Sequence, residues 1–161
     1  MRVTLIRHAE AGDDAPRDES RSLTVRGRAD TRRLGRVLAR RGVRFTLVVT
    51  SPLVRAVQTA EIVAAAIGYR GPLPASELLE PEAAALDVVA FLKTVADEKS
   101  VALVAHEPIL SAVAAALTHK PRHPALRKAE ALRIRLPDGP GGAGTLRWRI
   151  DGSRGTRERL R

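Results

Sequence analysis

Three short segments of almost wholly apolar residues constrain the fold of this chain more than any other feature. They read RVTLI at 2–6, FTLVVT at 45–50 and VALVA at 101–105, and each is followed by polar residues and then by a helical pattern. Strands that are buried on both faces of a parallel sheet have such uninterrupted apolar runs. The repeated order of strand and helix therefore predicts an α/β fold, a three-layer α/β/α sandwich with a mostly parallel central sheet.

Helical spacing and end signals predict four helices after these strands. The first is expected to run from a cap at Thr24 to about Arg41. The second is expected to begin at Ser51-Pro52, a serine cap followed by a proline in the first turn, and to end at Gly68. The other two are expected at about 84–97 and at ILSAVAAAL, 109–117.

The last part of the chain changes to a period of two residues. Apolar residues alternate with arginines in two stretches, which are separated by PDGPGGAG at 137–144. This pattern predicts a C-terminal antiparallel hairpin with its apolar residues on one face. No long linker divides the chain, so we expect a single domain over 1–152. The basic segment 153–161 has little to bury, and we expect it to fray.

Composition narrows the classes of function. The 161 residues include no cysteine, which excludes disulfides, thiolate metal sites and a cysteine nucleophile. No stretch approaches the ~18 apolar residues of a membrane span, so we expect a cytoplasmic protein without a membrane partner. We also expect a monomer. The net charge of +10 favours anionic ligands, among which nucleic acid must be considered. Aromatic residues make up only 2%, which argues against base stacking, so we expect no nucleic-acid partner.

Charged and imidazole side chains stand where the predicted strands end. Arg7-His8 follows the first strand, Arg55 lies in the first turn after the second, and His106 follows the third. Because the carboxyl ends of parallel strands share one edge of a sheet, we expect these side chains to lie close together. Guanidinium groups repel metal ions and match phosphoryl oxygens, so we expect no metal and no cofactor. An imidazole that nearby cations keep neutral is a competent nucleophile toward phosphorus.

Four motifs on these elements resemble the histidine phosphatase superfamily, the phosphoglycerate-mutase-like group. They are LIRHAEAG, RSLTVRG, SPLVRAVQTA and LVAHEP, they occur in the family's order, and they cover residues 3–108. Ala9 stands where the family's signature usually has a glycine. The short chain is similar to the SixA-type branch, and this resemblance implies a phosphoglycerate-mutase-like fold and the activity of a phosphohistidine phosphatase.

The resemblance also implies a role for each matching residue. His8 would be the nucleophile that becomes phosphorylated during turnover. Arg7, Arg55 and His106 would bind the phosphoryl oxygens and stabilise the transition state. Arg21, which precedes the Leu-Thr pair in RSLTVRG, is a further candidate for binding the substrate.

The motifs identify the nucleophile, but they do not identify the residue that donates a proton to the leaving group. Many family members use a carboxylate after the second helix, and Glu80 is the nearest candidate, with Glu77 and Glu82 behind it. The alternative is that no strong acid is needed, because the imidazole of a phosphohistidine leaves readily. Glu80 is therefore our candidate acid for substrates with poorer leaving groups.

The leading interpretation is a phosphatase that acts on phosphohistidine in a protein and releases inorganic phosphate. The chain leaves no room for an inserted cap domain, and an open site suits a bulky substrate. A small-molecule phosphomonoesterase of the same family is one alternative, and a non-catalytic anion-binding module is another. A mutase usually needs a lid that keeps water from the phosphorylated intermediate, and no segment is long enough to form one.

Overall fold

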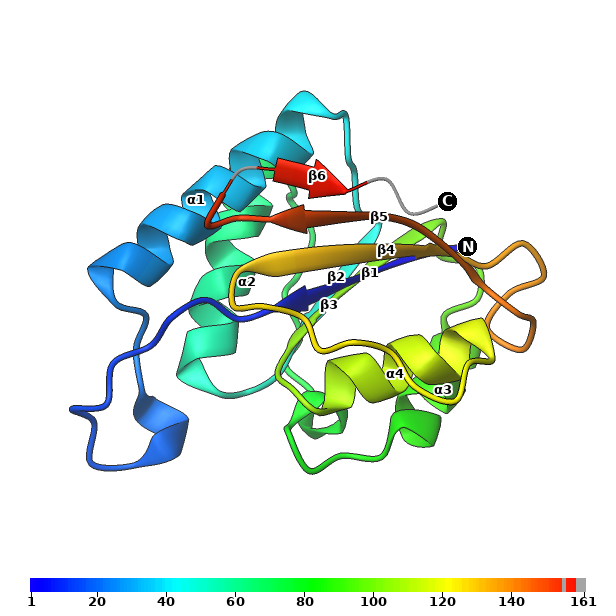
Figure 1. Ribbon diagram of the computed structural model, residues 1–161, viewed down its shortest axis with the longest axis horizontal. Helices are drawn as coiled ribbons and strands as arrows, with labels where there is room; N and C mark the ends of the chain where they lie inside the picture. Colours follow the sequence, from blue (N-terminus) through cyan, green and yellow to red (C-terminus); the bar gives the residue numbers. More distant parts are fainter. Residues whose placement is uncertain (155, 159–161) are drawn as a thin grey trace.

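The computed structural model describes residues 1–154 and 156–158, which form a mixed six-stranded sheet in the order β2-β3-β1-β4-β5-β6 (Figure 1). Strands β2, β3 and β1 pair in parallel, whereas β4, β5 and β6 continue the sheet beside β1 in antiparallel pairs. The sandwich is confirmed, and parallel pairing is limited to the three apolar segments at 2–6, 45–50 and 101–105. The strand bounds are β1 Arg2–Arg7, β2 Leu47–Thr50, β3 Ser100–Ala105, β4 Glu130–Arg135, β5 Thr145–Asp151 and β6 Thr156–Glu158.

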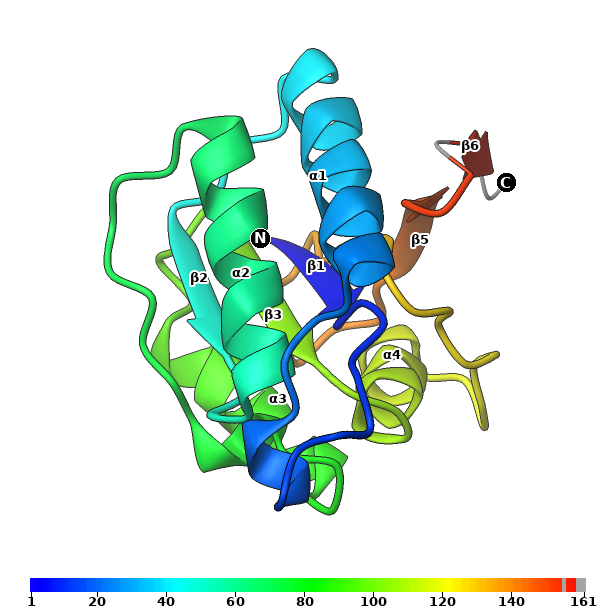
Figure 2. The same cartoon turned by 90° about the vertical axis from the view of Figure 1, so that its left-hand side faces the viewer.

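Two helices cover each face of the sheet. Helices α1 and α2 pack against each other on one face, and α3 and α4 pack on the other (Figure 2). Successive side chains of the central strands point to opposite faces of the sheet. Leu103 of β3 therefore packs under α3 and α4, whereas Val104 packs under α1 and α2. The continuous apolar run in β3 follows from this burial on both faces. The helix bounds are α1 Val25–Arg40, α2 Val54–Ile67, α3 Ala85–Thr94 and α4 Ile109–Thr118.

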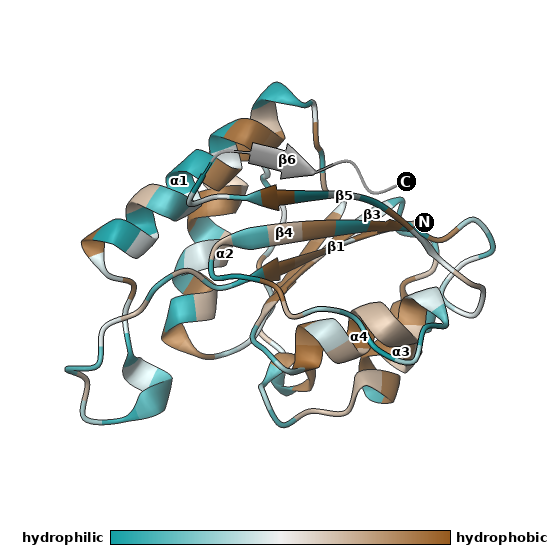
Figure 3. Cartoon of the chain, viewed as in Figure 1, coloured by the Kyte–Doolittle hydropathy of each residue, from teal (hydrophilic) through white to brown (hydrophobic). Residues whose placement is uncertain are grey.

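Aliphatic side chains supply nearly all of the core. Apolar colour predominates along β1 in Figure 3, whereas β4 and α1 mix apolar and polar colour. Phe45 and Trp148 are the large aromatic residues that join the layer under α1 and α2. Among the described helices, none combines the length and the apolar character needed to cross a membrane.

Local signals at the start of α1 and at the end of α2 act as predicted. The Oγ1 of Thr24 accepts a hydrogen bond from the backbone N–H of Gly27 at 2.9 Å, which caps α1. Gly68 ends α2 in the left-handed conformation, with φ of 70°. Helix α3 is shorter than the predicted 84–97, because the chain turns after Thr94 ahead of β3.

The predicted start of α2 at Ser51-Pro52 is wrong. The chain remains extended at Leu53, and the helix begins at Val54 without a side-chain cap. The hydroxyl of Ser51 lies 2.8 Å from Nε2 of His106 instead. Ser51 has the local sequence of a helix cap, but its hydroxyl contacts the imidazole that follows β3.

The C-terminal hairpin is confirmed by the antiparallel pairing of β4 with β5, which has a register shift between Arg133 and Ile134. Part of the segment that we expected to fray behaves differently. Residues Thr156–Glu158 form β6 and pair with β5. The remainder of that expectation, at residues 155 and 159–161, lies outside the described residues.

Gly27→Ala is expected to lower the free energy of unfolding by about 1–3 kcal/mol, the usual cost of overpacking. A Cβ at residue 27 would lie 2.1 Å from the carbonyl oxygen of Glu10, in the segment that follows β1. Urea titration followed by circular dichroism measures the change. Gly141→Ala is the matched control, because a Cβ there meets no atom within 4 Å. Equal stability of the two variants would contradict the close approach of α1 to Glu10.

Candidate active site

His8 follows β1 directly, and backbone contacts hold it on the sheet edge. Its N–H donates to the carbonyl oxygen of Ala105 at 2.9 Å, which extends the parallel ladder by one residue. Its Nδ1 lies 2.6 Å from the carbonyl oxygen of Ala9. A carbonyl oxygen only accepts, so Nδ1 carries the hydrogen and Nε2 of the neutral ring carries the lone pair.

His106 follows β3 and faces His8 across the strand ends. The two ring centroids are 4.9 Å apart, with the ring planes inclined at 52°. The Nε2 of His106 lies 2.8 Å from the Oγ of Ser51, the residue after β2. Its Nδ1 is buried and has no partner among the described residues. The ends of β1, β2 and β3 thus each contribute one polar side chain to a single cluster.

Both imidazoles are held neutral at physiological pH. Burial lowers the pKa of His8 to about 4, and the charges of Arg55 and Arg7 act in the same direction. Burial also lowers the pKa of His106 to about 3, with further contributions from His8 and Arg55. The sequence predicted that neighbouring cations keep the imidazoles neutral. The cations do lower the two pKa values, but the loss of hydration on burial lowers them more.

Arg55 is the second residue of α2 and is only 6% exposed. The helix dipole disfavours a cation at this end, and a carboxylate compensates for it. Nη1 of Arg55 donates to the carbonyl oxygen of Asp18 at 2.8 Å, and Nη2 donates to Oδ2 of Asp18 at 2.9 Å. Asp18 comes from the short 3-10 turn η1, Asp18–Ser20. Hydrogen bonds from Arg21 and Arg55 hold the pKa of Asp18 below its usual range, so this carboxylate is ionised.

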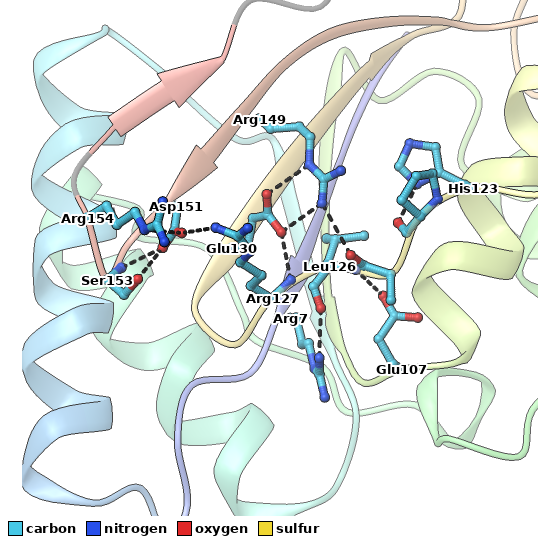
Figure 4. A network of polar contacts seen from close by, with 12 residues as sticks. Arg7, Glu107, His123, Leu126, Arg127, Glu130, Arg149, Asp151, Ser153 and Arg154 are labelled. Atoms are coloured by element: carbon cyan, nitrogen blue, oxygen red, sulfur yellow. Dashed lines mark hydrogen bonds and ion pairs between the residues drawn. The ribbon is translucent and has the colours of Figure 1, made fainter.

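Arg7, the last residue of β1, is held by a segment far along the chain (Figure 4). Its Nη1 donates to the carbonyl oxygen of Leu126 at 2.7 Å. The N–H of Leu126 in turn donates to Oε1 of Glu107 at 2.7 Å, and Oε2 of Glu107 accepts from Ser111. The Nε of Arg7 is buried without a partner in the described part of the chain. Arg7 is therefore held in place through Nη1, and the hydrogen on its buried Nε has no acceptor among the described residues.

Arg21 reaches the cluster through another residue. Its Nε donates to the carbonyl oxygen of Gly12 at 2.7 Å, and its Nη1 donates to Oδ1 of Asp18 at 3.0 Å. A further bond goes to Asp13. Within the described residues Arg21 thus contacts the partner of Arg55, and its role as a direct ligand of the substrate stays a prediction.

Glu80 follows the second 3-10 turn, η2 Glu77–Leu79, and is partly exposed. Its carboxylate forms no hydrogen bond or ion pair with the residues that the structure describes. Hydrogen bonds therefore do not hold the Glu80 carboxylate in a fixed orientation, as they hold the side chains of Arg7, His8 and His106. Its role as an acid stays a prediction.

The structure adds two residues that the sequence did not single out for the site. Asp18 stands three residues before Arg21, the first residue of RSLTVRG, and Ser51 opens the motif SPLVRAVQTA. No local sequence pattern indicates that Asp18 contacts Arg55 or that Ser51 contacts His106. Over residues 1–154 and 156–158, no three His, Cys, Asp or Glu side chains gather as a candidate metal site.

Comparison with known proteins identifies close relatives over most of the chain. Residues 3–81 match the histidine phosphatase superfamily, branch 1. An uncharacterized protein of Picosynechococcus sp. is 35% identical over 84% of this chain and 85% of its own length. The phosphohistidine phosphatase SixA of Escherichia coli is 29% identical over 93% of each chain.

Solved structures show the same relationship. The structure of the protein histidine phosphatase SixA complexed with tungstate has a TM-score of 0.89 at 26% identity, covering 96% of this chain and 99% of that one. The alpha-ribazole phosphatase of Shigella flexneri has a TM-score of 0.74 at 20% identity, covering 91% of this chain and 95% of that one. The second likeness concerns the fold alone.

The free energy of unfolding is expected to fall as the pH is lowered from about 6.5 to about 5. Folded His8 and His106 have pKa values of about 4 and about 3, against 6.5 for a free imidazole. In this window the unfolded chain binds more protons, so stability rises with pH, by up to about 1.4 kcal/mol per pH unit for each histidine. Urea titrations across the window measure this slope.

His106→Asn should make that slope shallower, since it removes one of the two buried imidazoles. His119→Asn, at an exposed position outside the cluster, is the matched control for the loss of an imidazole. An identical slope in His106→Asn and in the wild-type protein would contradict a neutral, buried His106.

Proposed function

The chain belongs to the histidine phosphatase superfamily and is an enzyme of that kind, and we propose that it removes the phosphoryl group from phosphohistidine in a protein. The products are the free imidazole of the substrate and inorganic phosphate. The observation that carries the proposal is the buried pair of imidazoles 4.9 Å apart, in which Nδ1 of His8 is committed to Ala9 and Nε2 holds the lone pair. The alternative of a non-catalytic module is set aside. Cytoplasmic location and the monomeric state stay predictions from the sequence.

In the first step, Nε2 of His8 attacks the phosphorus atom. The bond from phosphorus to the substrate nitrogen breaks, its electron pair stays on that nitrogen, and a proton from solvent completes the product imidazole. The hydrogen bond from Nδ1 to Ala9 stabilises the charge that develops on the ring of His8. The buried Nε of Arg7 lacks an acceptor among the described residues, and a phosphoryl oxygen would provide one.

In the second step, water attacks the phosphorus of phospho-His8. The bond from phosphorus to Nε2 breaks, the electron pair returns to Nε2, and the water oxygen leaves as part of inorganic phosphate while its proton passes to the phosphate or to solvent. The low pKa of His8 favours this step, because a weakly basic imidazole is a better leaving group. Burial that keeps His8 neutral therefore serves both halves of the reaction.

Asp18 orients Arg55 without using all of its donors. Each Nη of a guanidinium carries two hydrogens, and Asp18 takes one from each. The remaining hydrogens can bind phosphoryl oxygens, and a guanidinium fork held in one orientation is suited to stabilise charge in the transition state. Asp18 is on this argument a positioning residue for Arg55.

The choice of a protein substrate has support in the chain between α2 and α3. Residues 68–84 hold only the short turn η2, and the match to SixA extends over 96% of this chain. A small phosphomonoester is the second candidate, because His8 is only 8% exposed and a compact substrate reaches a recessed nitrogen more easily.

Acid-labile phosphate should be trapped on His8 when turnover of a phosphohistidine protein is quenched in alkali. His8→Ala should form no phosphoenzyme and should lose turnover, whereas His123→Ala, an imidazole outside the cluster, is the matched control. Mass spectrometry of the trapped protein identifies the modified residue. Label on a serine, or turnover that survives in His8→Ala, would contradict the mechanism.

The substrate class is tested by comparing kcat/KM for a phosphohistidine protein, a sugar phosphate and an aryl phosphate. We expect the highest value for the phosphohistidine protein. A higher value for the sugar phosphate would overturn the proposed substrate and leave the role of His8 intact.

Glu80→Gln should slow hydrolysis of an alkyl phosphate by roughly 10²-fold or more and barely affect phosphohistidine or aryl phosphate. An alkoxide needs a proton to leave, whereas an imidazole or a phenolate leaves readily. Glu61→Gln, an exposed carboxylate on α2 that is not a candidate acid, is the matched control. A small uniform effect on all substrates would mean that Glu80 only shapes the loop.

A further inference from the structure

A second basic site lies at the opposite edge of the sheet. At the amino ends of the parallel strands, an open hollow of about 490 Å³ lies between the carboxyl end of α1 and the start of β1. Figure 2 shows the carboxyl end of α1 at the top and the loop after β1 at the bottom. Six residues of strand, at about 3.3 Å each, separate Arg2 from His8 by roughly 20 Å. The charged and aromatic residues that line the hollow are Arg2, Arg40, Arg41, Arg133 and Trp148.

Arg133 is the unusual member of this group, because it is a buried cation without a carboxylate partner among the described residues. It is only 9% exposed, and its guanidinium carbon lies 5.2 Å from the centroid of the Trp148 ring. Nε donates to the hydroxyl of Thr4 at 3.0 Å and Nη2 to the hydroxyl of Ser100 at 3.2 Å, while Nη1 forms no hydrogen bond to the described residues. Burying a charge without a counter-ion is costly, so a bound anion would stabilise Arg133.

The helix dipole does not account for this concentration of charge. It favours Arg40 and Arg41, which lie at the carboxyl end of α1. Arg2 and Arg133 lie on β1 and β4 and add two further positive charges to the same hollow. None of the four arginines forms an ion pair within residues 1–154 and 156–158. A bound anion would relieve the repulsion among them.

We propose that this hollow binds a compact diphosphate, either free or as part of a small ester. Guanidinium groups recognise phosphate oxygens by paired hydrogen bonds, and four of them match a ligand with more than one negative charge. The volume is within the usual range of small-ligand sites. The proposal is independent of the substrate at His8, because it concerns another edge of the sheet.

Trp148 provides a local reporter, because it is the chain's one tryptophan and lines the hollow. Titration of the protein with inorganic pyrophosphate at constant ionic strength should change its fluorescence saturably. The double variant Arg40→Ser/Arg41→Ser should raise the Kd by about tenfold or more. Arg26→Ser/Arg32→Ser, two exposed arginines of α1 outside the hollow, is the matched control and should keep the wild-type Kd. Arg133 is left intact, since its burial could make a variant unfold.

Adenosine diphosphate, titrated in parallel, distinguishes the two sources of the ligand. An equal Kd assigns recognition to the diphosphate alone, and tighter binding assigns the site to an ester. The absence of a saturable change, or the same Kd in both double variants, would overturn the proposal. Loss of the response in Arg55→Ala would also overturn it, because binding would then belong to the cluster around His8.

Discussion

The cluster of imidazoles depends on the parallel pairing of β2, β3 and β1. The ladder continues one residue beyond the strands, since the N–H of Ser51 donates to Val104 and the N–H of His8 donates to Ala105, both at 2.9 Å. These two bonds bring a hydroxyl and two imidazoles together without any long side chain having to reach across. A slip of one residue in either pair would turn the polar side chain to the other face of the sheet. Chemistry at this edge is thus a consequence of strand register.

Burial then decides how each polar group of the cluster behaves. An imidazole can lose its proton and be buried neutral, which is the state of His8 and His106. A guanidinium cannot, so Arg55 is compensated by Asp18 and Arg7 by the carbonyl oxygen of Leu126. The neighbouring segment is fixed in the same way. Buried carboxylate oxygens of Glu130 accept from the N–H of Arg127 and from the side chain of Arg149, which hold the chain beside Leu126 (Figure 4).

The two edges of the sheet use positive charge differently. At the carboxyl edge, Arg55 has an acidic partner within the chain, and its positive charge is directed toward a small buried cluster. At the amino edge, Arg133 is packed against an aromatic ring and bonded to hydroxyls that leave its charge uncompensated. A high net positive charge by itself would favour anions over the whole surface, whereas these two groups of arginines differ in their local chemistry.

The sequence by itself determined strands β1 to β5, the order of strand and helix, and the three polar transitions, because apolar periodicity and end signals are local properties of the chain. It did not indicate β6, which lies in the segment expected to fray. Parallel topology then predicts that Arg7, His8, Arg55 and His106 lie at one edge, because the carboxyl ends of parallel strands meet there. Only the tertiary structure brought Asp18 to Arg55, 37 residues away, and Ser51 to His106, 55 residues away. It also left the carboxylate of Glu80 without a partner in the described part of the chain. No local pattern encodes such pairs, since each arises where two separate segments meet and the free energy of burying one polar group depends on the other.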